Sequence, residues 1–183
     1  MSRSISRYFQ GRWSGILVRC RDLHCESGQA LVELAVVLVF FIPPLLLGTA
    51  DVATLVYGSI EVSNAAHAGA VYGMTSSNLA SDTANIQAAA QNEASDFGGG
   101  SGVFSAALTV TPTAYWACSA NQGGTQYTGV NGKANAATAC TGTGNYPLEF
   151  IQVVVSAPVT LPFHCCGLPA TTTLSGTSVM EVY

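Results

Sequence analysis

The feature that most constrains this chain is an apolar run at residues 29–50 that directly follows a basic, polar segment. The run contains a single charge, Glu33, and Asp51 ends it. A helix needs about 20 apolar residues at a rise of 1.5 Å each to cross a bilayer, and this run meets that length. A chain with such a segment is expected to be anchored in a lipid bilayer.

Charge is divided unevenly between the two sides of the run. Residues 1–28 have a net charge of +3, whereas residues 29–183 have a net charge of −7 and contain Lys133 as their only lysine or arginine. Basic residues on the N-terminal side predict a cytoplasmic N-terminus and an exported C-terminal part. Because the exported part cannot neutralise phosphates, nucleic acid is excluded as its partner.

We divide the sequence into a basic cytoplasmic leader at 1–28, a long helix at 29–73 and an exported domain at 74–183. The helical pattern continues past the apolar run, because a face of apolar and mostly small residues repeats as far as residue 73. We expect the outer half of this helix to pack on the chain's own sheet. The membrane half has no such partner, so it must contact lipid or other subunits.

Two consecutive prolines, Pro43 and Pro44, lie within the apolar run. Each proline removes a helical hydrogen bond and clashes with the preceding turn. The sequence therefore predicts a kink in the middle of the membrane segment.

The exported part has the pattern of a small α+β domain. A short helix is expected at 83–97, with Asp82 as its N-cap, and β-like stretches are expected at 103–116, 148–160 and 171–183. An antiparallel sheet packed against the outer part of the long helix is the simplest way to bury these faces. Residues 117–147 show no periodicity and are expected to form a long exposed loop or binding surface.

The carboxylate of Glu33 needs an explanation, because an acidic residue inside a membrane helix is costly. A cut between Gly28 and Gln29 would give Gln29 a positively charged α-amino group. Gln29 and Glu33 are four residues apart and share one helical face, so Glu33 would pair with its own amine or with that of a neighbouring subunit. The plainer alternative is a Glu tolerated at the membrane interface.

The spacing of Gly28 and Glu33, with Glu33 at the fifth position of the apolar segment, resembles a type IV prepilin cleavage site. The run Gly28-Gln-Ala-Leu-Val-Glu, the later Gly48-Thr-Ala-Asp and the segment 64–72 together resemble TadE-like proteins. These proteins are minor pilins or pseudopilins of the tight-adherence (Tad, Flp-type) pilus machinery. The resemblance is specific over residues 28–73.

The resemblance implies cleavage after Gly28 by a prepilin peptidase and a role in pilus assembly. The implied partners are other pilins or pseudopilins and an inner-membrane assembly platform. The implied location is the bacterial inner membrane, with the C-terminal domain in the periplasm or outside the cell. The sequence departs from the family pattern at Gln29, where major type IV pilins have Phe, and at His67, where an acidic or basic residue is common.

Four cysteines lie in the exported part, where oxidation is permitted. They allow three pairings, and we favour Cys118 with Cys140 because that bond would join the two ends of the long loop. Adjacent cysteines such as Cys165 and Cys166 rarely bond to each other, so one of them is expected to pair elsewhere or to link subunits. The two leader cysteines, Cys20 and Cys25, should stay reduced.

The sequence favours a protein without catalytic, cofactor or metal sites. His164 next to Cys165 and Cys166 lacks the paired ligand spacing of a zinc site and the marked base of a thiol nucleophile. An exported thiol enzyme nevertheless remains one alternative, and an uncleaved single-pass anchor that presents a binding or adhesion module is another. The carboxylates of the body are scattered and form no acid/base pair: Asp82, Glu93, Asp96, Glu149 and Glu181.

Overall fold

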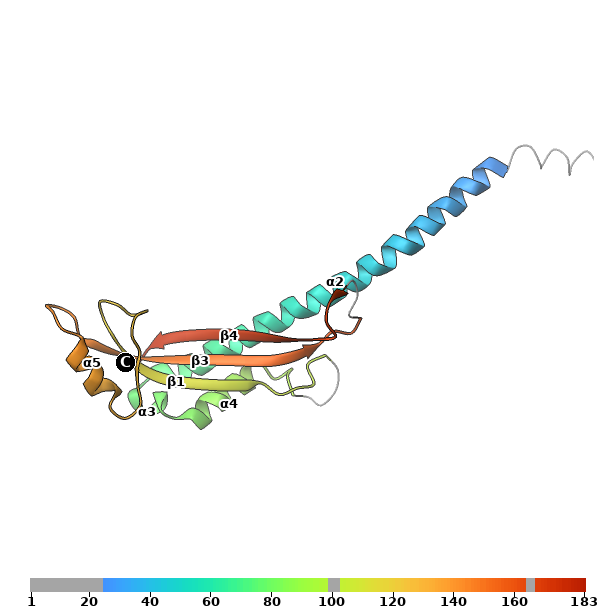
Figure 1. The fold of residues 1–183 in the computed structure, drawn as a ribbon. Coiled ribbons are helices and arrows are strands. Elements are labelled where there is room, and N and C mark those ends of the chain that lie inside the picture. Colours follow the sequence, from blue (N-terminus) through green and yellow to red (C-terminus); the bar gives the residue numbers. More distant parts are fainter. Residues whose placement is uncertain (1–24, 99–102, 164–166) are drawn as a thin grey trace, which may run out of the picture. The chain divides into compact units, whose positions relative to one another are not determined.

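A computed structural model of the protein describes residues 25–98, 103–163 and 167–183 (Figure 1). The chain divides into two compact units, Met1–Leu47 and Gly48–Tyr183. The long helix α2 (Cys25–Met74) contributes residues to both units. Each unit is described by itself below.

The described part of the first unit is the N-terminal portion of α2. Its large apolar side chains, from Leu31 to Leu47, are all exposed. The helix is long and apolar enough to cross a membrane, and its most apolar stretch has no burial within the protein. Such a surface has no protein core to cover it, which fits a single-pass anchor.

The second unit is built on a four-stranded antiparallel sheet. The strands are β1 (Thr109–Cys118), β2 (Tyr127–Thr128), β3 (Pro147–Thr160) and β4 (Thr171–Glu181), and their order in the sheet is β2-β1-β3-β4. The three long strands lie where the sequence predicted β-structure, and the two-residue β2 is additional. The expected α+β class, a long apolar helix followed by a domain with an antiparallel sheet, is confirmed.

Three short helices accompany the sheet: α3 (Ser77–Ala80), α4 (Thr83–Glu93) and α5 (Gly132–Ala139). Asp82 caps α4 as expected, because its carboxylate accepts a hydrogen bond from the backbone N–H of Asn85 at 3.2 Å. Hydrogen bonds from the side chain and backbone of Asn85 lower the pKa of Asp82. The helix ends at Glu93, four residues earlier than predicted, and residues 117–147 contain β2 and α5 rather than loop alone.

The core of the second unit lies between one face of the sheet and the helices α2 and α4. Glycines of α2 permit a close approach: a Cβ atom at Gly69 would lie 3.2 Å from Val153, and one at Gly73 would lie 3.0 Å from Ile151. The small residues of the outer helix therefore pack on the chain's own sheet. The core is mostly aliphatic and draws on α2, α4, β1 and β3: Val62, Ala65, Ala66, Ala70, Ile86, Ala90, Val110, Ile151, Val153, Val155, Ala157 and Val159.

The strand pairing defines two ends of the sheet. At the entry end, next to the start of the second unit at Gly48, Thr160 of β3 pairs with Thr171 of β4. At the far end, about 45 Å away along β3, Pro147 pairs with Cys118 of β1. Figure 1 shows α5 and the C-terminus at this far end. Both β1 and β4 therefore run from the entry end to the far end.

Candidate functional site

The N-terminal segment of α2 carries the residues predicted for processing and assembly. The side-chain amide of Gln29 donates a hydrogen bond to the carboxylate of Glu33 at 3.1 Å, as the spacing of four residues on one helical face allows. Gly28, Gln29 and Glu33 are all exposed. Because α2 begins at Cys25, the expected cut after Gly28 lies within this helix in the uncut chain.

The two prolines of the apolar run lie inside α2. The helix continues through Pro43 and Pro44 as one element from Cys25 to Met74. Their large apolar neighbours Ile42 and Leu45 are exposed. The predicted kink therefore stays a prediction. On both sides of the two prolines, the nearest exposed side chains of α2 are apolar.

Asp51 is a buried carboxylate with a structural partner that the sequence did not reveal. The backbone N–H of Phe163 donates to Asp51 Oδ1 at 3.1 Å, although the two residues are 112 positions apart. This bond attaches the first helical turn of the second unit to the segment between β3 and β4. The spacing could have indicated that Asp51 is buried. Asp51 lies on the same face of the helix as Gly58 and Val62, and this face packs on the sheet.

Removing this acceptor is expected to destabilise the second unit. Asp51→Ala removes the acceptor of the Phe163 N–H from a fully buried position, at a cost of about 1–3 kcal/mol in the free energy of unfolding. Asp51→Asn keeps an oxygen at Oδ1 and is the matched control, with a smaller loss. Thermal unfolding combined with amide exchange at Phe163 measures the effect, and equal exchange in the two variants would contradict the assigned role.

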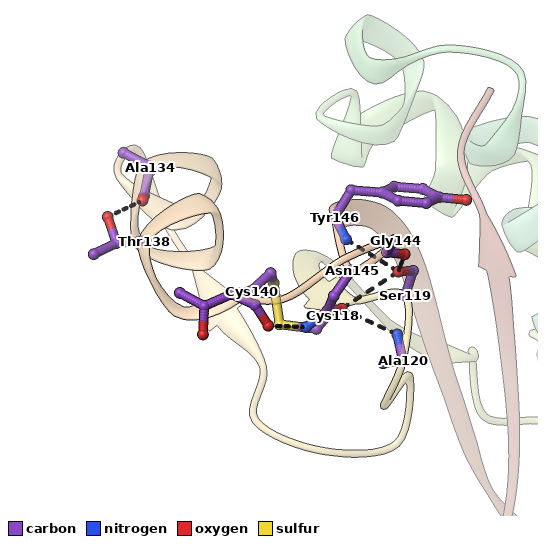
Figure 2. The surroundings of a disulfide bond; sticks show 10 residues. Cys118, Ser119, Ala120, Ala134, Thr138, Cys140, Gly144, Asn145 and Tyr146 are labelled. Atoms are coloured by element: carbon purple, nitrogen blue, oxygen red, sulfur yellow. Dashed lines mark hydrogen bonds between the residues drawn. A yellow bond between two sulfur atoms is a disulfide. The ribbon is translucent and has the colours of Figure 1, made fainter.

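A disulfide closes the far end of the sheet. Cys118, the last residue of β1, bonds to Cys140, which follows α5, with an S–S distance of 2.03 Å. Figure 2 shows the neighbouring contacts: the backbone N–H of Tyr146 donates to Ser119 Oγ at 3.1 Å, and the backbone N–H of Ala120 donates to Asn145 Oδ1 at 3.2 Å. The pair favoured on the sequence is thus the pair that the structure joins.

One cation lies beside this disulfide-closed segment. Lys133 of α5 places its Nζ 5.1 Å from the centre of the Trp116 ring, a cation–π contact between α5 and β1. Tyr146, directly before the neighbouring strand β3, is 57% exposed. The far end therefore carries an exposed aromatic residue together with the Lys133–Trp116 contact.

The remaining candidate residues are the histidines, cysteines and carboxylates of the C-terminal part. Among the residues that the structure describes, no three His, Cys, Asp or Glu side chains gather as metal ligands. The triplet His164, Cys165 and Cys166 lies outside the described residues, as does Cys20. The hydroxyl of Tyr57 donates to Asp96 Oδ2 at 2.5 Å, and chiefly this bond raises the pKa of Tyr57 to about 12.

Comparison with known proteins identifies the N-terminal segment. The family model described as "TadE-like protein" matches residues 28–71. No curated protein and no solved structure matches the chain. The family match covers the exposed apolar helix, the Gln29–Glu33 pair and the buried Asp51. Residues 28–71 of this chain are therefore similar to TadE-like proteins, as their sequence indicated.

Proposed function

We propose that this protein is a TadE-like minor pilin or pseudopilin that acts in the assembly of a Tad (Flp-type) pilus. The observation that carries the proposal is the family match over residues 28–71, which suggests a pilus-associated protein. The exposed apolar half of α2 and the exported α+β domain are the two parts that such a protein needs.

Processing by a prepilin peptidase is the first step of the proposed mechanism. The enzyme cuts between Gly28 and Gln29 from the cytoplasmic side and removes the basic leader. Gly28 is exposed, and among the described residues no atom outside its own helical turn lies within 4 Å of where its Cβ would be, which supports access by a protease. The cut leaves a cationic amine at the start of an apolar helix.

Assembly through the apolar helix is the second step. In the uncut chain, the Glu33 carboxylate accepts a hydrogen bond from the Gln29 side chain. After the cut it lies one helical turn from the new amine and acts as the counter-ion of this amine or of the amine of a neighbouring subunit. The exposed apolar side chains of the same helix pack against lipid, other pilins or the inner-membrane platform. The proposed activity is therefore packing, without a catalytic step.

Processing is tested at Gly28. Protein isolated from its native host is expected to begin at Gln29, as N-terminal sequencing would show. Gly28→Phe is expected to block the cut because a bulky side chain enters the peptidase site, whereas Gly28→Ala should slow it mildly. An intact leader in a host with an active prepilin peptidase and working pili would refute processing.

Assembly is tested at Glu33. Glu33→Val should leave membrane insertion intact, since it removes a cost of burying charge, yet it should strongly reduce the number of pili per cell. Glu33→Asp keeps the carboxylate and should restore part of the count. Glu61→Gln, which removes a carboxylate from the outer part of α2, is the control for charge alone. Normal piliation in Glu33→Val cells would contradict the role of Glu33.

A second candidate is an uncleaved single-pass anchor that presents a binding or adhesion module. The disulfide-closed far end favours it, because that end exposes the side chains of Tyr146 and Val130. Retention of the leader in mature protein would favour this candidate over the pilin. The same N-terminal sequencing therefore separates the two functions.

A further inference from the structure

We propose that the outer edge of β4 is a docking edge that accepts an extended, uncharged strand of a second protein. The choice of occupant rests on the proposed membrane anchoring, whereas the edge itself is a property of the second unit alone. Four observations carry the proposal: the direction of the β4 backbone groups, the absence of protection on β4, the protection of the opposite edge, and an apolar flank of α2 above β4.

The pairing of β3 with β4 shows which β4 residues direct their backbone groups outward. At one end the N–H of Leu161 donates to the carbonyl of Ala170, and at the other the N–H of Val182 donates to the carbonyl of Glu149. Hydrogen-bonded pairs alternate along an antiparallel ladder. The residues that turn their N–H and C=O groups away from β3 are therefore Thr173, Ser175, Thr177 and Val179.

These outward groups are open and unprotected. Within 25–98, 103–163 and 167–183, no strand pairs with this side of β4. Residues 171–180 contain no charged residue and no proline, and the strand is 11 residues long. Soluble proteins protect such edges with lysine, proline, bulges or short strands, because an open edge pairs with other chains. The edge of β4 uses none of these sequence devices.

The opposite edge of the same sheet is protected. By the same alternation, Val110, Pro112, Ala114 and Trp116 of β1 direct their backbones away from β3. The carbonyl of Val110 accepts a hydrogen bond from the Gln87 side chain at 3.1 Å. Pro112 has no N–H to offer, and Trp116 pairs with Tyr127 of β2. One edge of the sheet is therefore protected at three of these four positions, including a proline that blocks strand addition, and the other edge is open.

An apolar flank of α2 lies on the same side as the open edge. The α2 backbone passes over β4 at Ser63, whose Cα would lie 2.9 Å from a Cβ at Gly176. Val52 and Val56 lie 11 and 7 residues before Ser63 and so share its flank of the helix. Their side chains are 52% and 53% exposed. A strand added to β4 would extend the sheet beneath this flank and cover it.

The occupant is a strand of a second protein rather than a second copy of this chain. Within the second unit α2 and β4 run in the same direction, because Gly58 lies against Leu174 and the carbonyl of Val62 lies against Gly176. An antiparallel pair of β4 strands would therefore put the two Gly48 residues, where the apolar segments join, at opposite ends of the paired sheets, so the two anchors would not enter one membrane side by side. A parallel pair on a two-fold axis would set each residue against itself, whereas a parallel ladder needs an offset, and Glu181 would meet Glu181. The β1 edge of a neighbouring copy cannot serve, because it is protected.

The chemistry of the edge specifies the partner segment. Because residues 171–180 are uncharged, the partner strand gains nothing from charge and is expected to be uncharged over about ten residues. Its side chains should alternate: apolar ones beneath Val52 and Val56, and small polar ones beside Thr173, Ser175 and Thr177. This is an amphipathic strand in the mode of β-augmentation.

The experiment uses the full chain in its native host, with a photo-crosslinking amino acid at Thr177 or at Thr111. Both positions lie on the same face and in the same row of the sheet, because each is paired with Val154. Thr177 is expected to give an adduct with one second protein, whose crosslinked peptide is an uncharged, alternating segment. Thr111 should give no such adduct.

A backbone change shows whether strand pairing produces the adduct. Ser175→Pro removes one outward N–H and leaves the hydrogen bonds to β3 in place. It should lower the adduct yield about tenfold, which corresponds to 1.4 kcal/mol. Ser175→Ala keeps the N–H and should leave the yield unchanged. An unchanged yield in Ser175→Pro, equal adducts at Thr111, or an adduct between two copies carrying different tags would overturn the proposal.

The same cells separate this inference from the proposed function. Pili that form normally while Thr177 gives no adduct would overturn the docking edge and leave the pilus role standing. Deletion of the gene without any loss of pili, combined with a Thr177 adduct that Ser175→Pro abolishes, would overturn the pilus role and leave the docking edge standing.

Discussion

Gly176→Val is expected to lower the melting temperature of the second unit, Gly48–Tyr183, by roughly 10 °C, corresponding to a loss of about 3 kcal/mol. Glycine in a strand interior usually weakens a sheet, so strand propensity alone predicts that valine would stabilise β4. The close contact of Gly176 with α2 makes the expected change in stability unfavourable instead. A Cβ at Gly176 would lie 2.9 Å from both Ser63 Cα and the carbonyl oxygen of Val62. Both are backbone atoms of α2, so the helix would have to lift from the sheet.

Thermal unfolding of the full chain in detergent measures this effect. Gly123→Val is the matched control, because nothing lies within 4 Å of a Cβ at that exposed position. It should leave the melting temperature almost unchanged. A melting temperature for Gly176→Val equal to or above that of the wild type would show that α2 does not rest on β4 at this point.

Local patterns were sufficient to predict much of this fold. The apolar run at 29–50, the alternation in residues 150–156 and the glycine-rich and asparagine-rich character of 117–147 each depend on neighbours in the sequence. They correctly located α2, β3 and the segment that the disulfide closes. The Gln29–Glu33 contact is also local, because a helix brings residues four apart together.

Long-range contacts were beyond such patterns. The bond from Phe163 to Asp51 joins residues that only the return of β3 brings together, so no window of sequence contains it. Gly176 is an ordinary glycine in sequence, and the need for it arises from α2 passing over β4. The helix α5 was missed because its sequence, from Gly132 to Ala139, has no apolar face to reveal it. Its position is instead fixed by Cys140 and by the contact of Lys133 with Trp116.

Replacing Cys118 and Cys140 together with serine is expected to reduce stability by about 3 kcal/mol. The bond closes a loop across a sequence separation of 22, and opening it restores conformational freedom to the unfolded chain. The local effect should be larger at the far end than in the core. Besides the disulfide, α5 is held there by the packing of its buried Gly132 and Ala136 and by the Lys133–Trp116 contact, whereas β3 and β4 are joined by a continuous ladder of hydrogen bonds.

Two measurements test the global and the local parts of this effect. The melting temperature should fall by roughly 10 °C, and the amides of α5 should exchange much faster than those of Val153 and Val155. The wild-type protein under reducing conditions should reproduce the double variant, and it serves as the control for the serine side chains. Unchanged exchange in α5 would mean that the Lys133–Trp116 contact and the Asn145 hydrogen bonds hold the far end without the disulfide. The far end would then be rigid through its own packing, and its closed shape would not depend on export to an oxidising compartment.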